Sequence, residues 1–469
     1  MIVAADVGGM WRGRVVSVLL LWGCVGVWSA PPTPVASPLP TPDMILIMID
    51  GFRWDYLDLH RGDGLPGFER MITKGVSAKH LNPVFPADSF PNWRTIVTGL
   101  YAENHGIVGN FMYDLEHKKA FSLFELESTA DPVWWTDAEP LWITATKNNK
   151  DTALFHWSRC DVPWEGVLPK YCVPYEEIGP TPRYFINHLH QALDMIQHEG
   201  YQLVMVYEGA VDIQGHNYGP ASGEVDAVIR EVDSGLQGLW DALAIRGMMN
   251  TTNVVLVSDH GMTETSSDDF HYLDVTPCLD DQQILGAVKG SGYLNIEPTP
   301  GYSEQVIESL RNCPGVGDKI DVYRKKDLPE VYHYKTHRLI LELIVIAKEG
   351  YIIRNLDLRN AMPHGSSEVP GNHGFDNIQG QNPDMHGILY AIGPSFVKGV
   401  EVGAMEQVDV YGLLCHALDL PCHAHNGSEA RVQAFFNPIT SGVTRMESCH
   451  LQMIILLAYV LSLWQVLLR

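Results

Sequence analysis

The sequence has no Cys-x-x-Cys pair, little positive charge and no internal repeat. Without such a pair, a zinc site built from thiolates is not expected. The 32 Lys and Arg residues stand against 56 Asp and Glu residues, which gives a formal net charge of -24. Because a chain this acidic offers little to neutralise a run of phosphates, we expect no nucleic-acid partner.

The length and composition are those of a globular protein with a large core. The chain has 469 residues, of which 46% are hydrophobic and 19% are charged. A chain of this size folds either as one elaborate α/β domain or as two domains.

The amino terminus has the features of a secretory signal peptide over residues 1–30. Arg12 and Arg14 precede an apolar run at 15–27, which is short for a membrane span and ends in Trp28-Ser29-Ala30. Residues 31–43 are rich in proline and predict an extended linker. We therefore expect the folded domain to occupy residues 44–435.

The carboxyl terminus has the features of a lipid-anchor (GPI) signal over residues 441–469. Small residues at Ser441 and Gly442 are followed by a polar spacer and an apolar tail at 451–468. This order is typical of a signal whose tail is removed when the anchor is attached. The alternative is a single membrane span, although the chain ends at Arg469. We expect the protein at the extracellular face of the cell membrane, with a secreted or single-pass form as the alternative.

The cysteines fit an exported protein. Once the two terminal segments are set aside, an even number of cysteines remains, which suits an oxidising compartment. Proximity along the chain favours pairing Cys160 with Cys172, Cys278 with Cys313, and Cys415 with Cys422, although other connectivities stay open. Asn250 and Asn426 lie in Asn-x-Ser/Thr sequons and are candidate glycosylation sites.

Apolar runs that end at polar residues predict buried strands that carry a functional site. Such runs cover residues 44–49, 203–207 and 253–257, and they lead to Asp50, Glu208 and Asp259-His260. Open α/β sheets bind their ligands at the carboxyl ends of strands. Asp259 and His260 reach one metal only if a turn, which Gly261 permits, re-aims one of them. The alternative is a capping aspartate beside a surface histidine.

Helix and loop signals add further candidates. Ser89 precedes Pro91 at the expected start of a helix that ends at Gly99; it either caps that helix or uses its amino terminus, which favours anions. Asn110, in a glycine-punctuated loop, either donates to a substrate oxygen or occupies a turn.

Two more segments supply histidines. Asp212 and His216 are four residues apart, so one helical turn places both on the same face. Such a pair is usually an ordinary surface contact, but this one follows a strand end. His373 lies in a loop at 371–377 that we expect to be flexible.

Together the candidates comprise three carboxylates and three imidazoles: Asp50, Asp212, Asp259, His216, His260 and His373. Oxygen and nitrogen ligands without thiolate suit zinc. They are too many for one tetrahedral ion and suit two ions, with Ser89 able to complete one site. A pair of metals about 4 Å apart can stabilise both the attacking and the leaving oxygen of a phosphoryl transfer.

At this point the sequence resembles a known family, the ectonucleotide pyrophosphatase/phosphodiesterases of the alkaline phosphatase superfamily. The resemblance runs from about residue 44 to residue 430. It implies an alkaline-phosphatase-like α/β fold with a central, mostly parallel β-sheet flanked by helices on both faces. The motifs that carry it are Asp50, Phe85-Pro86-Ala87-Asp88-Ser89-Phe90-Pro91-Asn92, Asn110-Phe111-Met112-Tyr113-Asp114, Asp212-x-x-x-His216-x-Tyr218-Gly219-Pro220, Ser258-Asp259-His260-Gly261-Met262-Thr263 and His373-Gly374-Phe375-Asp376-Asn377.

The resemblance also implies roles for these residues. Two Zn2+ per subunit are expected, one held by Asp212, His216 and His373 and the other by Asp50, Ser89, Asp259 and His260. Ser89 would be the nucleophile that forms a covalent intermediate. Asn110 and the backbone N–H that follows Ser89 would stabilise a phosphate oxygen.

Within the family, Ser89 and Phe111 replace the threonine and lysine of most nucleotide-cleaving members. The serine, the spacing of Cys160 and Cys172 and the expected anchor are similar to the sixth member, a glycerophosphocholine choline phosphodiesterase. We therefore expect hydrolysis of choline phosphodiesters such as glycerophosphocholine or lysophosphatidylcholine to phosphocholine. Tyr207, Glu208 and Trp157 are the candidates to bind the quaternary ammonium.

Other functions stay open at this level. A nucleotide pyrophosphatase/phosphodiesterase or a sphingomyelin phosphodiesterase would use the same metal core, and a catalytically silent surface receptor could retain the fold. A late cysteine that links the choline-specific relative into a dimer corresponds to Ala434. The sequence therefore gives no support for an oligomer.

Overall fold

The computed structural model describes residues 41–436 except for 61–63, 177–180, 267, 269–270, 355, 363–367 and 379–381. The expected signal peptide, most of the linker and the expected anchor signal lie outside the described residues. Among the residues described, no helix is long and apolar enough to cross a membrane.

The central sheet has eight strands in the order β19-β2-β18-β9-β1-β8-β6-β7. β7, β6, β8, β1 and β9 are parallel, and β18 runs antiparallel to both β9 and β2. The sheet is thus mostly parallel, as predicted. The strand bounds are β1 Asp43–Ile49, β2 Val76–Ala78, β6 Thr152–Phe155, β7 Tyr171–Val173, β8 Leu203–Glu208, β9 Thr252–Val257, β18 Leu389–Ile392 and β19 Val400–Val402.

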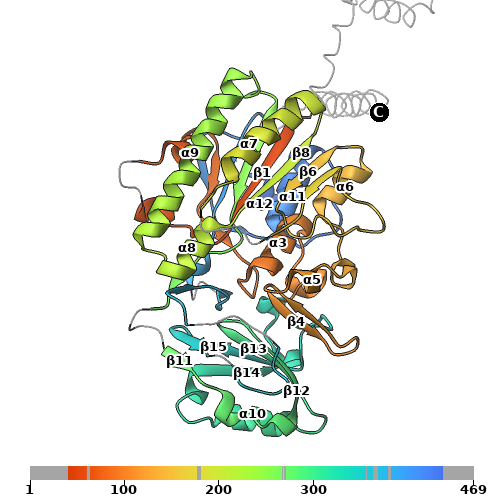
Figure 1. The fold of residues 1–469 in the computed structure, drawn as a ribbon, viewed down its shortest axis with the longest axis vertical. Coiled ribbons are helices and arrows are strands. Elements are labelled where there is room, and N and C mark those ends of the chain that lie inside the picture. The colour runs from red at the N-terminus through yellow and green to blue at the C-terminus, as the bar shows by residue number, and fades with distance from the viewer. Residues whose placement is uncertain are drawn as a thin grey trace, which may run out of the picture. The chain divides into compact units, whose positions relative to one another are not determined.

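Strand β1 shows why its sequence is uniformly apolar. Alternate side chains of a strand point to opposite faces, and both faces of β1 are buried. Ile45, Ile47 and Ile49 belong to one apolar core, whereas the alternate residues Met44 to Met48 belong to another. The first core includes residues of α2 (Pro66–Lys74), α7 (Phe185–Asp194) and α9 (Gly223–Ile245), and the second includes residues of α3 (Ser89–Thr98), α6 (Leu141–Lys147) and α11 (Asp409–Leu418). Helices therefore cover both faces of the sheet, which confirms the predicted fold class (Figure 1).

A smaller antiparallel sheet follows β9 along the chain and has an apolar core of its own (Figure 1). Its strands are β12 (Ile284–Lys289), β13 (Tyr293–Pro298), β15 (Leu343–Ala347) and β14 (Ile320–Arg324), packed with α10 (Ser303–Arg311). The remaining short elements are α1 Tyr56–Leu59, β3 Leu81–Asn82, α4 Ala102–His105, β4 Phe111–Asp114, β5 Lys119–Ser122, α5 Leu126–Thr129, α8 Ala210–Tyr218, β10 Thr263–Glu264, β11 His271–Leu273, β16 Tyr351–Ile353, β17 Gly371–Asn372, β20 Met405–Glu406 and α12 Glu429–Gln433.

The disulfide predictions are confirmed in two cases and wrong in one. Cys160 pairs with Cys172 and Cys278 pairs with Cys313. The third pair is not joined: Cys415 is a buried free thiol on α11 and Cys422 an exposed free thiol beyond that helix. Their side chains lie within hydrogen-bond reach of each other. Asn250 and Asn426 are both exposed, and their glycosylation stays a prediction.

We expect the amino-terminal cap of the long helix α9 to make a measurable contribution to the stability of the protein. The Ser222 side chain accepts a hydrogen bond from the Val225 N–H (3.2 Å), so Ser222→Ala should lower the free energy of unfolding by about 1 kcal/mol. The matched control is Ser234→Ala on the exposed surface of the same helix, with an expected change within about 0.5 kcal/mol. Equal losses in urea unfolding of the two variants would contradict the capping role.

Candidate functional site

The candidate metal ligands meet because the strands that carry them are neighbours. β1 lies between β8 and β9, with Ile49 paired to Glu208 and Met48 paired to Val257. The three strands therefore end at nearly the same level. Asp50 follows β1, Asp259 follows β9, and α8 continues from β8 with Asp212 in its first turn.

The first group of ligand atoms surrounds the Nε2 atom of His260. Asp50 Oδ1 and Asp259 Oδ2 each lie 3.4 Å from it, and Ser89 Oγ lies 3.1 Å from it. Zinc bonds of about 2.0–2.1 Å in a regular tetrahedron place two ligand atoms about 3.4 Å apart. The distances of the other three atoms from His260 Nε2 are thus of the size that ligands of one ion have.

The second group is formed by Asp212, His216 and His373. Asp212 Oδ2 lies 3.5 Å from His216 Nε2, and Asp212 Oδ1 lies 3.8 Å from His373 Nε2. Asp212 also lies within reach of Asp50 and His260. Asp212 is therefore the residue that joins the two groups.

The three histidines are oriented in the same way. Each Nδ1 lies at hydrogen-bond distance from a backbone carbonyl: 2.9 Å from Gly261 for His260, 2.8 Å from Gly371 for His216, and 3.0 Å from Ala87 for His373. A carbonyl accepts only from a protonated nitrogen, so in the neutral ring the proton is on Nδ1 and Nε2 is the nitrogen that can bind a metal. Histidines that bind metals are commonly fixed by such contacts.

The buried carboxylates of the site would be stabilised by a bound cation. Burial, and then the charges of Asp259 and Asp212, raise the pKa of Asp50 well above its usual value. Asp50 Oδ1 and Asp212 Oδ1 are buried without a hydrogen-bond partner in the described part of the chain. Burial, and then the neighbouring His260, lowers the pKa of His373 well below its usual value, which favours the neutral ring that a metal needs. The residues present therefore fit bound metal ions.

Ser89 and Asn110 lie together at the amino terminus of α3, but not as the sequence suggested. The Phe90 N–H donates to Asn110 Oδ1 (2.9 Å), so the backbone N–H that follows Ser89 is already paired. The expectation that this N–H binds a phosphate oxygen is corrected accordingly. Because the Asn110 oxygen accepts from Phe90, its Nδ2 amide is the group left to donate to a substrate.

Sequence reasoning missed two aromatic residues that hold the carboxylates. The Trp93 indole N–H donates to Asp259 Oδ2 (2.6 Å), and the Tyr207 hydroxyl donates to Asp50 Oδ2 (2.6 Å). The only signal for Trp93 was its position four residues after Ser89, on the same helical face. For Tyr207 the sequence predicts a different role, which is binding of the quaternary ammonium of a substrate.

Two glycines allow the backbone to pass close to the site. Gly51 has φ +64°, and a Cβ there would lie 2.7 Å from Asp212 Oδ1. A Cβ at Gly261 would collide with the carbonyl oxygen of Asp384. Gly261 is therefore needed for a close approach of two backbones, and Asp259 and His260 do reach one place, with Asp259 Oδ2 3.4 Å from His260 Nε2. The 371–377 loop, expected to be flexible, is held by pairing of β17 with β10.

The three residues predicted to bind a choline group do not line the adjacent cavity. Trp157 is fully buried, and Glu208, which is 1% exposed, accepts a hydrogen bond from the Ala210 N–H. Tyr207 is engaged by Asp50. The cavity beside the metal ligands, about 100 Å³ in volume, is lined instead by Asn110, Phe111, Phe124, His216, Lys289 and His373, among others.

The comparison with known families supports this geometry. A sequence model of the family described as type I phosphodiesterase / nucleotide pyrophosphatase matches residues 44–376. The chain belongs to this family. The match supports hydrolase activity on phosphodiester or pyrophosphate bonds, in a metal-dependent family to whose chemistry the Asp and His groups are suited.

Individual members of the family are similar over most of their length. The human bis(5'-adenosyl)-triphosphatase ENPP4 is 34% identical over 396 residues, which cover 84% of this chain and 81% of that protein. The human ectonucleotide pyrophosphatase/phosphodiesterase family member 5 is 34% identical over 84% of this chain and 78% of its own. The structure of murine family member 5, an inactive form in complex with AMP, superposes with a TM-score of 0.74 at 32% identity and covers 84% of this chain and all of that one.

We expect each histidine group to hold its own metal. His216→Ala should lose about one metal ion per chain and His260→Ala the other, because each removes a nitrogen ligand from a different group. Metal content after dialysis, measured by mass spectrometry, checks this. His190→Ala, an exposed histidine on α7, is the control and should keep both ions. Full metal content in His216→Ala and His260→Ala would contradict the assignment.

Proposed function

We propose that the protein is a zinc-dependent hydrolase that cleaves phosphodiester or pyrophosphate bonds of nucleotides, with Ser89 as the nucleophile. One observation carries the proposal. The Ser89 hydroxyl lies at the amino terminus of α3 and 3.1 Å from His260 Nε2, among ligand atoms that have the spacing of a zinc site. A helix amino terminus favours the negative charge of an incoming phosphate.

Two ions are proposed, one held by Asp212, His216 and His373 and the other by Asp50, Ser89, Asp259 and His260. When bound, zinc supplies a lowered hydroxyl pKa and stabilisation of negative charge on oxygen. Ser89 Oγ loses its proton and attacks phosphorus, the bond from phosphorus to the leaving oxygen breaks, and that oxygen leaves with a proton. The phosphate, with its remaining ester group, is then carried on Ser89. Water then cleaves the bond between Ser89 and phosphorus and restores the hydroxyl. Asn110 Nδ2 donates to a non-bridging oxygen, a contribution typically worth about 3 kcal/mol.

Nucleotides are the substrate class that the relatives favour. One human relative is a bis(5'-adenosyl)-triphosphatase, and the murine relative is seen in complex with AMP. In this chain Phe111 and Phe124 line the cavity with ring centroids 5.4 Å apart. Aromatic faces of this kind stack favourably on a nucleobase.

Choline phosphodiesters are the second candidate. Ser89 and Phe111 stand where most nucleotide-cleaving members carry threonine and lysine, which favours this alternative. The assay compares diadenosine triphosphate, ATP, glycerophosphocholine, lysophosphatidylcholine and sphingomyelin. Release of AMP supports the nucleotide proposal. Release of phosphocholine without AMP overturns it in favour of the choline alternative.

We also propose that residues 1–30 direct export and that residues 441–469 direct attachment of a lipid anchor, with residues 44–435 as the catalytic domain. The pairs Cys160–Cys172 and Cys278–Cys313 support an oxidising compartment. Release of the protein from expressing cells by a phosphatidylinositol-specific phospholipase is the expected result. Complete retention would favour a membrane span.

Replacing Ser89 should separate chemistry from metal binding. Ser89→Ala removes the attacking oxygen and should lower kcat by about 10³-fold or more, while the other ligands still bind metal. Ser89→Thr keeps a hydroxyl and should retain activity within about tenfold. Rates and metal content are measured on the same preparations. Normal turnover by Ser89→Ala would exclude the covalent intermediate.

A further inference from the structure

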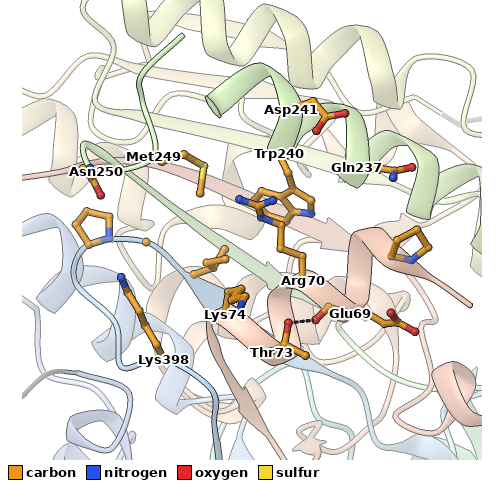
Figure 2. A pocket seen from close by; sticks show the side chains of 14 residues that line it. Glu69, Arg70, Thr73, Lys74, Gln237, Trp240, Asp241, Met249, Asn250 and Lys398 are labelled. Carbon is orange, nitrogen blue, oxygen red and sulfur yellow. Dashed lines mark hydrogen bonds between the residues drawn. The ribbon is translucent and has the colours of Figure 1, made fainter. Parts of the chain in front are cut away.

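A second and larger cavity lies away from the metal ligands, between α2, α9 and the segment after β18 (Figure 2). Its volume is about 610 Å³, which is within the range of small-molecule sites. The turn before β9 also lines it through Met249 and Asn250.

The cavity and the catalytic edge lie at opposite ends of the same strands. The Asp43 N–H, at the start of β1, donates to the carbonyl of Thr251, next to Asn250 at the cavity (2.9 Å). Asp50 follows the other end of β1, which has 7 residues and is therefore roughly 20 Å long. A molecule bound in the cavity would not occupy the catalytic site.

Three positive side chains line this cavity: Arg70 and Lys74 of α2, and Lys398 after β18 (Figure 2). In the part of the chain that the structure describes, none of them is paired with a carboxylate, and the Arg70 Nε atom is buried with no hydrogen-bond partner. Glu69 and Asp241 also line the cavity, which leaves one net positive charge. In a protein of net charge -24, unpaired cations from two separate segments favour an anionic ligand.

The cavity also lies beside the carboxyl end of the described chain. The Val397 N–H donates to the carbonyl of Phe435 (3.0 Å), and Phe396 and Phe436 form an antiparallel bridge. Lys398 follows directly along the chain. The proposed anchor site near Ser441 is a few residues beyond Phe436, and that length of extended chain reaches at most roughly 20 Å. An anchored protein would therefore hold the cavity near the membrane surface.

We propose that Arg70, Lys74 and Lys398 form a second site, which binds a phosphate-bearing anion in this cavity. Arginine and lysine together suit phosphate, because a guanidinium can bind two of its oxygens while ammonium groups neutralise its charge. The ligand is either a free phosphate compound or the headgroup of an anionic lipid. The site is independent of the proposed hydrolytic function.

The test compares Lys74→Ser/Lys398→Ser with Lys79→Ser/Lys326→Ser, which removes the same charge at exposed positions that do not line the cavity. Both variants of the full-length, metal-loaded protein should keep wild-type hydrolysis and Tm. One arm counts sites for inorganic phosphate by equilibrium dialysis, because the metal ligands also take phosphate. The other arm measures binding to phosphatidylcholine vesicles with and without phosphatidylserine, in about 0.15 M salt to screen non-specific attraction.

We expect the cavity variant to lose one phosphate site per chain, or to bind phosphatidylserine vesicles at least tenfold more weakly, while the control variant matches wild type. Loss of a phosphate site identifies a soluble anion, and loss in the vesicle arm alone identifies a lipid headgroup. The count is a difference of one site, so it holds whether or not the metal ligands bind phosphate. Loss in neither arm, or equal loss in the control variant, overturns the proposal.

Discussion

The concentration of buried negative charge at one edge of the sheet is the constraint on which the site depends. Asp50, Asp212 and Asp259 meet there because three adjacent parallel strands end together. Burial, and then repulsion from Asp259 and Asp212, raises the pKa of Asp50 well above its usual value. Such an arrangement is stable only if cations or protons compensate it. The ordered imidazoles beside it, each with Nε2 directed at the carboxylates, make cations the better match.

The apolar core and the site are connected through aromatic residues. Trp93 and Tyr207 pack against each other with ring centroids 5.1 Å apart, and Tyr175 contacts both at 5.2 and 5.6 Å. The polar ends of Trp93 and Tyr207 donate to Asp259 and Asp50. Aromatic side chains combine a large buried surface with one hydrogen-bonding group. Packing within the core therefore also sets the orientation of two proposed ligands.

Much of the fold could be predicted because local sequence patterns report it directly. The apolar run at 44–49 became β1, and the helix expected from Ser89 ends at Gly99, which has φ +68°. The ligand candidates could be found because each follows a strand end, lies in a glycine-containing loop or falls at a helical spacing. These signals involve only a few neighbouring residues, so they can be recognised in the sequence without knowledge of the tertiary structure.

The residue roles that could not be predicted depend on contacts between distant parts of the chain. Tyr207 meets Asp50 across 157 positions, and Trp93 meets Asp259 across 166, so neither role has a local signature. Nothing in the sequence indicates that the Phe90 N–H is already hydrogen-bonded, because its partner, Asn110, is 20 residues away. The close approach of Gly261 to the backbone of Asp384 joins segments more than 100 residues apart, so it has no local signal either. The same reason explains Trp157, whose burial is a property of the assembled core.

Substrate choice is a separate physical problem from the metal chemistry. In the proposed mechanism, the metal ligands, Ser89 and Asn110 act on the phosphoryl group, which nucleotides and choline phosphodiesters share. Groups beyond the phosphate meet the cavity wall, where Phe111 and Phe124 lie beside Lys289, whose pKa burial lowers to about 8. These wall residues come from β4, the segment after β5 and the end of β12, whereas the proposed ligands lie on or beside other elements. The motifs therefore identify the reaction more firmly than the substrate, because they concern the phosphoryl group and the cavity wall lies outside them.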